Sequence, residues 1–552
     1  MAAVDVLLGH ALFMDLDPKQ SAKSKPYPPL ATLYMAALLR QAGYQVAVFD
    51  AMLAPDEGAF REALARHRPR LVVMFEDNFN FLSKMCLARM RQAALAMIRM
   101  AAVDGVPVVA AGSDATDEPG EFLAAGALAV ALGEGDHTVA EVVATVLGPP
   151  SSDSGVPQRF PGPDGRPIRE RLCGIAGLAL ADGNRVLRTA VRPPERRPDV
   201  FPLPARDLVD LEAYRKVWYQ AHGYFSINMA ATRGCPFHCN WCAKPIWGQR
   251  YAMRTPRAVA EEMAELKRTI APDHVWFADD IFGLRPDWTA EFGQEVARLN
   301  AQIPFQIQSR VDLMSEAAVE GLSRAGCTEV WLGVESGSQR ILDAMEKGIQ
   351  VADVPAAVER LQRVGIRVCF FLQFGYPGET WADIKATAAL VRRLLPDEIG
   401  ISVSYPLPGT RFYEWVAAEL GEERHWHDSK DLAMLFQGSY PSDFYRRLHG
   451  LLHRELDLRH ALDRFDSSPG GVESVDHIAN SPGCVESDAT ASNRTASGGT
   501  ADRAGLERDL ALVMREWQEL AAVEPELRTA APTHISPPGV TRPAPDLSRA
   551  AN

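Results

Sequence analysis

Short apolar runs alternate with longer amphipathic segments through the first 150 residues of the chain. Runs of strand length lie at 4–8, 44–51, 70–77, 106–112 and 127–135, and apolar residues recur at helical spacing over 30–43, 57–67, 83–103, 118–126 and 137–148. Repeated strand–helix alternation indicates a parallel sheet with helices on both faces. We therefore predict that residues 1–150 form a doubly wound α/β domain, whose ligands bind beyond the carboxyl ends of the strands.

The same alternation returns over residues 216–450. Strands are predicted at 224–234, 273–280, 304–312, 327–336, 366–375 and 398–406, with helices at 255–270, 285–300, 315–326, 354–365 and 380–395. Six strands, each joined to the next by a helix, predict a partial (β/α)6 barrel of the TIM type. In such barrels the functional residues gather at the carboxyl ends of the strands.

Two segments do not follow this alternation. Residues 151–215 are rich in proline and charge, which predicts a linker with at most a small strand pair. Residues 451–552 are predicted to be a small helical C-terminal region. Within it, 466–505 is rich in Ser, Gly, Asp and Ala and is predicted to be disordered, and a helix is predicted at 505–524.

Composition narrows the class of protein. Of 552 residues, 47% are hydrophobic and 23% charged, and the net charge is −13, which is ordinary for a globular protein and does not favour nucleic-acid binding. No run reaches the roughly 20 apolar residues of a membrane span, and the N-terminus lacks the basic leader of a signal peptide. We expect a cytoplasmic protein with no membrane span and no nucleic-acid partner.

Three of the eight cysteines lie in one segment, RGCPFHCNWCAK, at residues 233–244. Cys235, Cys239 and Cys242 follow the first strand of the second region in a C-x3-C-x2-C pattern. Clustered thiols in a reducing compartment indicate a metal site. Four thiolates would close an iron–sulfur cubane, whereas three leave one iron open, as a catalytic metal site requires. The alternative is a zinc site with His238 as fourth ligand, although a neighbour of Cys239 is poorly placed to chelate beside both cysteine arms.

This motif, with Trp241 before its last cysteine, resembles the signature of the radical S-adenosylmethionine (radical SAM) enzymes, and the resemblance covers residues 220–450. It implies that the three cysteines hold a [4Fe-4S] cluster and that SAM chelates the open iron through its amino and carboxylate groups. Reductive cleavage of SAM would then yield a 5′-deoxyadenosyl radical. An external electron donor, such as a flavodoxin or a ferredoxin, is implied as well.

Later strand ends resemble the SAM contacts of this family. A carboxylate after the second strand would accept hydrogen bonds from the methionyl amino group. A basic residue after the third would pair with the SAM carboxylate, a pair after the fourth would contact the ribose, and a loop after the fifth would line the adenine. These positions are Asp279 or Asp280, then Arg310, then Glu335 with Ser336, then Gly375, Tyr376 and Pro377. The family's glycines are missing beside Asp279 and Asp280, so the choice between them stays open.

An α/β domain ahead of such a barrel resembles the cobalamin-binding, Rossmann-like domain of one radical SAM class. Matching segments are Tyr27–Leu30, 110–116 and 132–138. Many of these domains carry a D-x-H-x-x-G segment after the third strand, whose histidine ligates cobalt, but residues 75–80 here read Phe-Glu-Asp-Asn-Phe-Asn. Either cobalamin binds without a protein nitrogen ligand, or the domain has lost cobalamin and serves as a scaffold or substrate-binding lobe. His10 and His137 also lie near strand ends.

The resemblance implies a radical SAM enzyme that acts on a small-molecule substrate, with methyl transfer through cobalamin as the favoured reaction. The alternative is a radical oxidation, cyclisation or rearrangement without methyl transfer. A hypothesis of another class is a non-catalytic Fe–S electron carrier or sensor, which would need neither an open iron nor a nucleotide pocket. No residue is assigned a catalytic role, and the sequence does not identify the substrate.

Overall fold

The computed structural model describes residues 3–84, 87–149, 167–244, 246–420, 432–467 and 503–528. The chain divides into two compact units. One contains Met1–Cys235 and Lys244–Asp280, and the other contains Pro236–Ala243 and the described residues from Ile281 onward. The domain boundaries expected at residues 150, 215 and 450 stay predictions.

The N-terminal sheet confirms the five predicted parallel strands and adds two more. Its order is β2-β1-β3-β4-β5-β6-β7, with β1–β5 parallel and β6 and β7 antiparallel. The added hairpin lies in the predicted linker and extends the sheet because β6 buries Leu178 and Ala179 against β5. The strands are β1 Val6–Gly9, β2 Val46–Phe49, β3 Leu71–Phe75, β4 Val108–Ala111, β5 Ala129–Ala131, β6 Leu178–Asp182 and β7 Arg185–Arg188.

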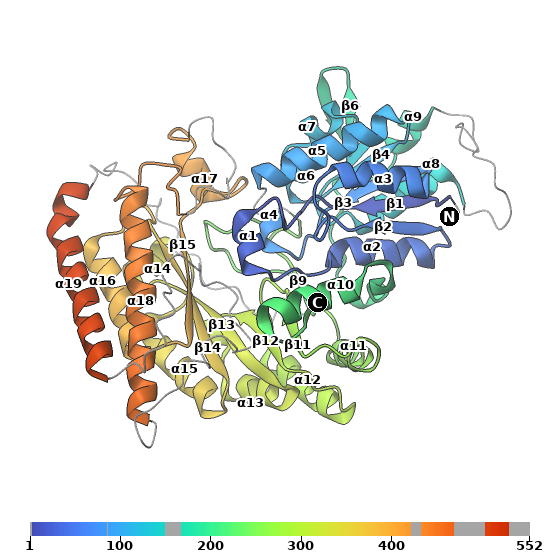
Figure 1. The fold of residues 1–552 in the computed structure, drawn as a ribbon. Coiled ribbons are helices and arrows are strands. Elements are labelled where there is room, and N and C mark those ends of the chain that lie inside the picture. The colour runs from blue at the N-terminus through green and yellow to red at the C-terminus, as the bar shows by residue number, and fades with distance from the viewer. Residues whose placement is uncertain are drawn as a thin grey trace. The chain divides into compact units, whose positions relative to one another are not determined.

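Helices lie on both faces of this sheet, as predicted, with α2 beside α8 and α3 beside α5 (Figure 1). The helix expected over 83–103 is present as α5 but begins five residues later, at Ala88, because Leu87 before it has non-helical backbone angles; the short α4 ends at Lys84. Helix α6 was not predicted. The helices are α1 Pro18–Lys23, α2 Leu30–Gln41, α3 Gly58–His67, α4 Phe81–Lys84, α5 Ala88–Val103, α6 Ser113–Asp117, α7 Pro119–Ala124, α8 Asp136–Leu147, α9 Ile168–Leu172 and α10 Leu211–His222.

The six predicted strands of the partial barrel are also present, in the order β15-β14-β13-β12-β11-β8. The first predicted strand is shorter than expected, since the chain turns after β8 and forms an antiparallel pair of β9 with β10. The strands are β8 Ser226–Met229, β9 Thr232–Gly234, β10 Tyr251–Met253, β11 His274–Phe277, β12 Phe305–Ser309, β13 Cys327–Glu335, β14 Arg367–Phe374 and β15 Glu398–Val403.

Local signals explain most of the barrel helices. Thr255 and Ser315 cap α11 and α13 with their side chains, and Gly326 ends α13 in the left-handed conformation that glycine tolerates. Helix α14 was not predicted. The helices are α11 Pro256–Thr269, α12 Pro286–Arg298, α13 Glu316–Ala325, α14 Gln339–Ala344, α15 Val354–Arg363 and α16 Trp381–Leu394.

Three further helices complete the described chain: α17 Arg411–Val416, α18 Ser442–Ser467 and α19 Arg503–Leu527. Helix α19 confirms the helix predicted at 505–524, and it lies beside α18 (Figure 1), where Arg454 donates to Glu516 at 3.0 Å. The ends of the segment predicted to be disordered are helical, at 466–467 and 503–505, and the rest of it lies outside the described residues. No helix in the described ranges has the length and apolar character that crossing a membrane requires.

Candidate functional site

The three motif cysteines are partly exposed on the loop that follows β9. Within the described part of the chain, no three Cys, His, Asp or Glu side chains already converge as a metal site. The donor set nevertheless fits an iron–sulfur cluster, because thiolates are the ligands that such clusters take. His238, the residue considered for zinc, is exposed and donates from Nδ1 to the Pro236 carbonyl at 3.0 Å.

Asn240 fixes the middle of this cysteine loop. Its backbone N–H donates to the Met345 carbonyl at 3.1 Å, and its Nδ2 donates to the Ala344 carbonyl at 2.7 Å. The Tyr376 hydroxyl lies 2.9 Å from Asn240 Oδ1, and the Phe412 N–H donates to the Asn240 carbonyl at 3.0 Å. Sequence reasoning missed Asn240, because an asparagine in a short loop carries no readable pattern. The structure gives it the role of anchoring the loop between the second and third cysteines.

Arg310 also anchors the cysteine loop. Its guanidinium lies 3.6 Å from the ring centroid of Phe237. Its Nε and Nη2 donate to Asp312 at 2.9 and 3.0 Å, and its Nη1 donates to the Lys347 carbonyl at 2.9 Å. Arg310 therefore supports the loop that carries the cysteines, and its pairing with the SAM carboxylate stays a prediction.

Glu335 ends β13 with a positive φ of 60° and forms a buried ion pair, its Oε1 lying 2.6 Å from Lys347 Nζ. Burial alone would lower the pKa of Lys347, but the negative charges of Glu335 and Cys239 outweigh it and raise that pKa. Lys347 was not predicted. It places a buried positive charge within electrostatic reach of a motif cysteine. Ser336 is buried beside Thr387, with the two hydroxyl oxygens 3.3 Å apart.

Asp279 and Asp280 differ sharply in environment. Asp279 is buried and accepts hydrogen bonds from the Ala231 N–H, at 3.1 Å, and from the Thr232 hydroxyl. Burial raises its pKa to about 7, against the lowering effect of these bonds. Asp280 is exposed. Asp279 thus ties down the turn between β8 and β9 that leads to the cysteines, and which of the two contacts SAM stays open.

The predicted adenine loop, Gly375–Tyr376–Pro377, follows β14. Gly375 has a φ of 74°, and its N–H donates to the buried carboxylate of Glu379 at 2.7 Å. Trp241 packs against an apolar cluster that contains Tyr376. The cysteine loop and the predicted adenine loop therefore share one core.

The segment after β3, where a cobalt-ligating histidine was missing, holds three buried polar residues, Glu76, Asp77 and Asn78. Asp77 accepts from the N–H groups of Leu30 and Ala31 at 3.2 and 3.0 Å and so caps the start of α2. Glu76 accepts from the Ala11 N–H at 3.0 Å, and burial raises its pKa to about 7. Carboxylate and amide groups therefore stand where many domains of this kind carry a histidine.

Unpartnered buried polar atoms gather in the segments at this end of the N-terminal sheet. An unsatisfied buried polar atom costs about 1–3 kcal/mol, so each needs an explanation. The carboxyl edge of a parallel sheet is where ligands bind, and cobalamin carries amides around its ring that would satisfy such atoms. The residues present therefore fit cobalamin. The atoms are His10 Nδ1, Glu76 Oε1, Asn78 Oδ1, Ser83 Oγ and Ser113 Oγ.

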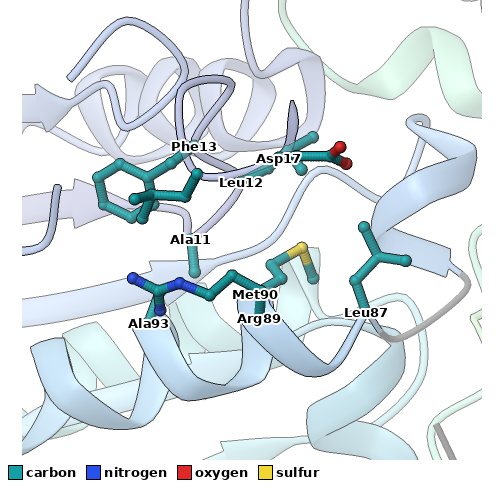
Figure 2. A pocket seen from close by; sticks show the side chains of 9 residues that line it. Ala11, Leu12, Phe13, Asp17, Leu87, Arg89, Met90 and Ala93 are labelled. Atoms are coloured by element: carbon teal, nitrogen blue, oxygen red, sulfur yellow. The ribbon is translucent and has the colours of Figure 1, made fainter. Parts of the chain in front are cut away.

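A small pocket opens beside the same edge (Figure 2). Its lining comes from the loop after β1, with Leu12, Phe13 and Asp17, and from Leu87 and Met90 at the start of α5. Asp17 is buried and accepts from the N–H groups of Lys19 and Gln20 at 2.9 and 3.1 Å, capping α1. The pocket is mostly apolar and lies between the chain directly after β1 and the start of α5.

Comparisons with known proteins agree with this geometry. The family model of the B12 binding domain matches residues 24–143, and that of the Radical SAM superfamily matches residues 229–391. An uncharacterized methyltransferase of Pyrococcus horikoshii (PH0819) is 29% identical over 249 residues, which cover 45% of this chain and 53% of that protein. The chain thus matches about half the length of this curated relative.

Two solved structures share the fold. TsrM, a radical S-adenosylmethionine methyltransferase from Kitasatospora setae with cobalamin and a [4Fe-4S] cluster bound, has a TM-score of 0.59 at 20% identity, over 75% of this chain and 78% of that one. OxsB, a cobalamin-dependent S-adenosylmethionine radical enzyme with aqua-cobalamin and S-adenosylmethionine bound, has a TM-score of 0.63 at 12% identity, over 85% and 69%. At these identities the likeness shows the fold alone.

The two matched domains imply the cofactors that were expected from the sequence. A radical SAM domain implies a [4Fe-4S] cluster, SAM, a substrate and a reductant, and a B12-binding domain implies cobalamin. The chain belongs to the radical SAM proteins that carry a B12-binding domain.

Proposed function

We propose that the protein is an enzyme that transfers a methyl group from SAM, through cobalamin, to a small-molecule substrate. The observation that carries the proposal is that one chain combines a loop of three partly exposed cysteines with a sheet edge of unpartnered buried polar atoms. A non-catalytic electron carrier would have no use for the second feature. PH0819 and TsrM are both named as methyltransferases, which supports the same reaction.

Within this proposal, Cys235, Cys239 and Cys242 hold the cluster and leave one iron for SAM. The cluster supplies the electron that cleaves SAM, and cobalamin supplies a methyl carrier. The remaining tasks belong to the protein, which must orient the ligands and exclude water. Asn240 and Arg310 keep the cysteine loop in place, and Trp241 packs it against the apolar core.

The other predicted contacts complete the proposed SAM site. Glu335 and Ser336 lie at the carboxyl end of β13, where the ribose is expected, and Gly375, Tyr376 and Pro377 follow β14, where the adenine is expected. Asp279 or Asp280 would receive the methionyl amino group, and Arg310 would face the SAM carboxylate. A flavodoxin or a ferredoxin would supply the electron.

The test is to purify and reconstitute the protein without oxygen, measure iron, sulfide and cobalt, and analyse SAM products with a strong reductant. We expect iron and cobalt, with both 5′-deoxyadenosine and S-adenosylhomocysteine released. Release of 5′-deoxyadenosine without S-adenosylhomocysteine would indicate that the reaction is an oxidation, cyclisation or rearrangement and not methyl transfer. Neither product, with zinc bound in place of iron, would overturn the proposal.

A further inference from the structure

Arg233, two residues before the first motif cysteine, is held by the loop that follows β5 and by the first residue of α8. Its Nη1 donates to Glu134 Oε1 at 2.6 Å and to Asp136 Oδ2 at 3.1 Å, and its guanidinium lies 4.0 Å from the ring centroid of Phe201. All three charged side chains are at least 90% buried, at 6, 8 and 6% exposure for Arg233, Glu134 and Asp136. Breaking a buried, hydrogen-bonded ion pair is strongly unfavourable, so β9 and this loop move together.

The same loop contacts the chain again just after the motif. Gly133 has a φ of 73°, and a Cβ on it would lie 3.3 Å from the carbonyl oxygen of Ile246. Gly135 has a φ of 83° and lies against the ring of Phe75, at the end of β3. The loop after β5 is thus fixed to the segments on both sides of the cysteine motif, at Arg233 and at Ile246, and to the sheet edge.

This loop also belongs to the edge where the B12-binding domain takes its ligand. It therefore contacts two features that would need it ordered: the sheet edge, where cobalamin would bind, and Arg233 and Ile246, which flank the cysteine motif in the chain. When one ligand orders a shared element, the second binds with a smaller entropic cost, and the coupling is reciprocal.

We propose that Arg233, with Glu134 and Asp136, couples cobalamin binding to cluster binding, so that each cofactor raises the affinity of the protein for the other. The inference rests on the proposed function for the identity of the two cofactors. Arg233, Glu134 and Asp136 are positioning residues in this account: they act through the loop and need not touch either cofactor.

The experiment measures the dissociation constant of hydroxocobalamin, without oxygen, for the reconstituted protein and for a cluster-free form in which Cys235, Cys239 and Cys242 are alanine. For the wild type we expect cobalamin to bind about 5- to 150-fold more tightly when the cluster is present, the usual range of coupling between sites. We call this factor the affinity ratio. In Arg233→Gln the affinity ratio should approach one. Arg233→Lys keeps the positive charge without the planar fork of donors, so its affinity ratio should lie between those of the wild type and Arg233→Gln.

Arg70→Gln is the matched control. Arg70 donates to Asp5 at 2.9 Å just before β3, at the amino edge of the same sheet, so its variant should keep the wild-type ratio. Circular dichroism and thermal unfolding confirm that each variant is folded. If Arg233→Gln does not fold, Glu134→Gln is tested in its place. This change removes one of the two carboxylates that bind Arg233, while Asp136 still neutralises its charge. The affinity ratio of Glu134→Gln should fall below that of the wild type.

The coupling is overturned by a wild-type ratio of one, or by an unchanged ratio in Arg233→Gln or, where that variant does not fold, in Glu134→Gln. Neither result would affect the proposed function, since cobalamin would still bind. A protein that binds no cobalamin in either form would overturn both proposals.

Discussion

The Tyr376 hydroxyl, in the loop after β14, lies 2.9 Å from Asn240 Oδ1, in the cysteine loop. Burial raises the pKa of Tyr376 above the ordinary value, so the hydroxyl stays protonated and acts as the donor. This hydrogen bond joins the loop predicted to line the adenine to the loop predicted to hold the cluster.

Removing that hydroxyl should weaken both loops. For Tyr376→Phe we expect about 1–3 kcal/mol less stability, because the buried Asn240 oxygen loses a donor, together with a lower iron content after reconstitution. Denaturant unfolding and iron analysis measure the two effects. Tyr413→Phe, in α17, is the control, since its hydroxyl makes no hydrogen bond within the described ranges. Equal behaviour of the two variants would contradict the anchoring role.

The buried Lys347–Glu335 pair should matter for stability and for the cluster. Truncating Lys347 to Met leaves a buried carboxylate unpaired and should cost about 3–5 kcal/mol. The comparison is Arg411→Met, which breaks the more exposed pair with Glu346 and should cost about 0–1 kcal/mol.

Lys347→Met should also make the reduction potential of the cluster more negative, since a nearby positive charge favours the reduced state. An EPR-monitored redox titration of wild type and variant checks the direction. A potential that is unchanged, or that becomes more positive, would show that Lys347 does not act on the cluster.

Cobalt should lack a protein nitrogen ligand, because the segment after β3 offers only oxygen and amide groups, from Glu76 to Asn78. A bound nitrogen splits the EPR lines of cob(II)alamin in a pattern that depends on the nitrogen isotope. We expect identical spectra from unlabelled and uniformly 15N-labelled protein. A spectrum that changes with the label would reveal a protein nitrogen on cobalt, and His10→Ala would then test the buried histidine that directly follows β1.

Glu76 should make the N-terminal domain less stable as the pH rises. Its pKa is raised from 4.5 unfolded to about 7 folded, so the folded state binds more protons between these values. Stability that is present below pH 4.5 is therefore lost as the pH rises toward 7, by about 3 kcal/mol in total. Glu76→Gln removes this ionisation, and its unfolding free energy should vary less over that range. Parallel pH profiles for the two proteins would contradict the assignment.

The strands and most helices that join them could be predicted because their apolar spacing is periodic, as in β13 and α16. Helix α10 was not predicted, and α18 was expected only as part of a helical C-terminal region. Sequence reasoning also missed α6 and α14, which are too short to show a period, and it placed the start of α5 too early, because the non-helical backbone angles of Leu87 have no signal in composition.

The candidate site was predictable only where residue type alone carries the chemistry, as with the three cysteines. Asn240 acts through Tyr376, Lys347 through Glu335 and Arg233 through Glu134, and each partner lies at least 12 positions away in the chain. Such pairings depend on the folded arrangement and leave no local pattern, so only the structure could reveal them.

The central claim is that methyl groups pass from SAM to cobalamin on this protein, and it can be tested before the substrate is known. The reconstituted protein is incubated with cobalamin, a reductant and SAM whose methyl group carries deuterium, and the cobalamin is then extracted and examined by mass spectrometry. The account predicts the deuterated methyl group on the extracted cobalamin. Bound cobalamin that remains unlabelled while the cluster is intact would contradict it.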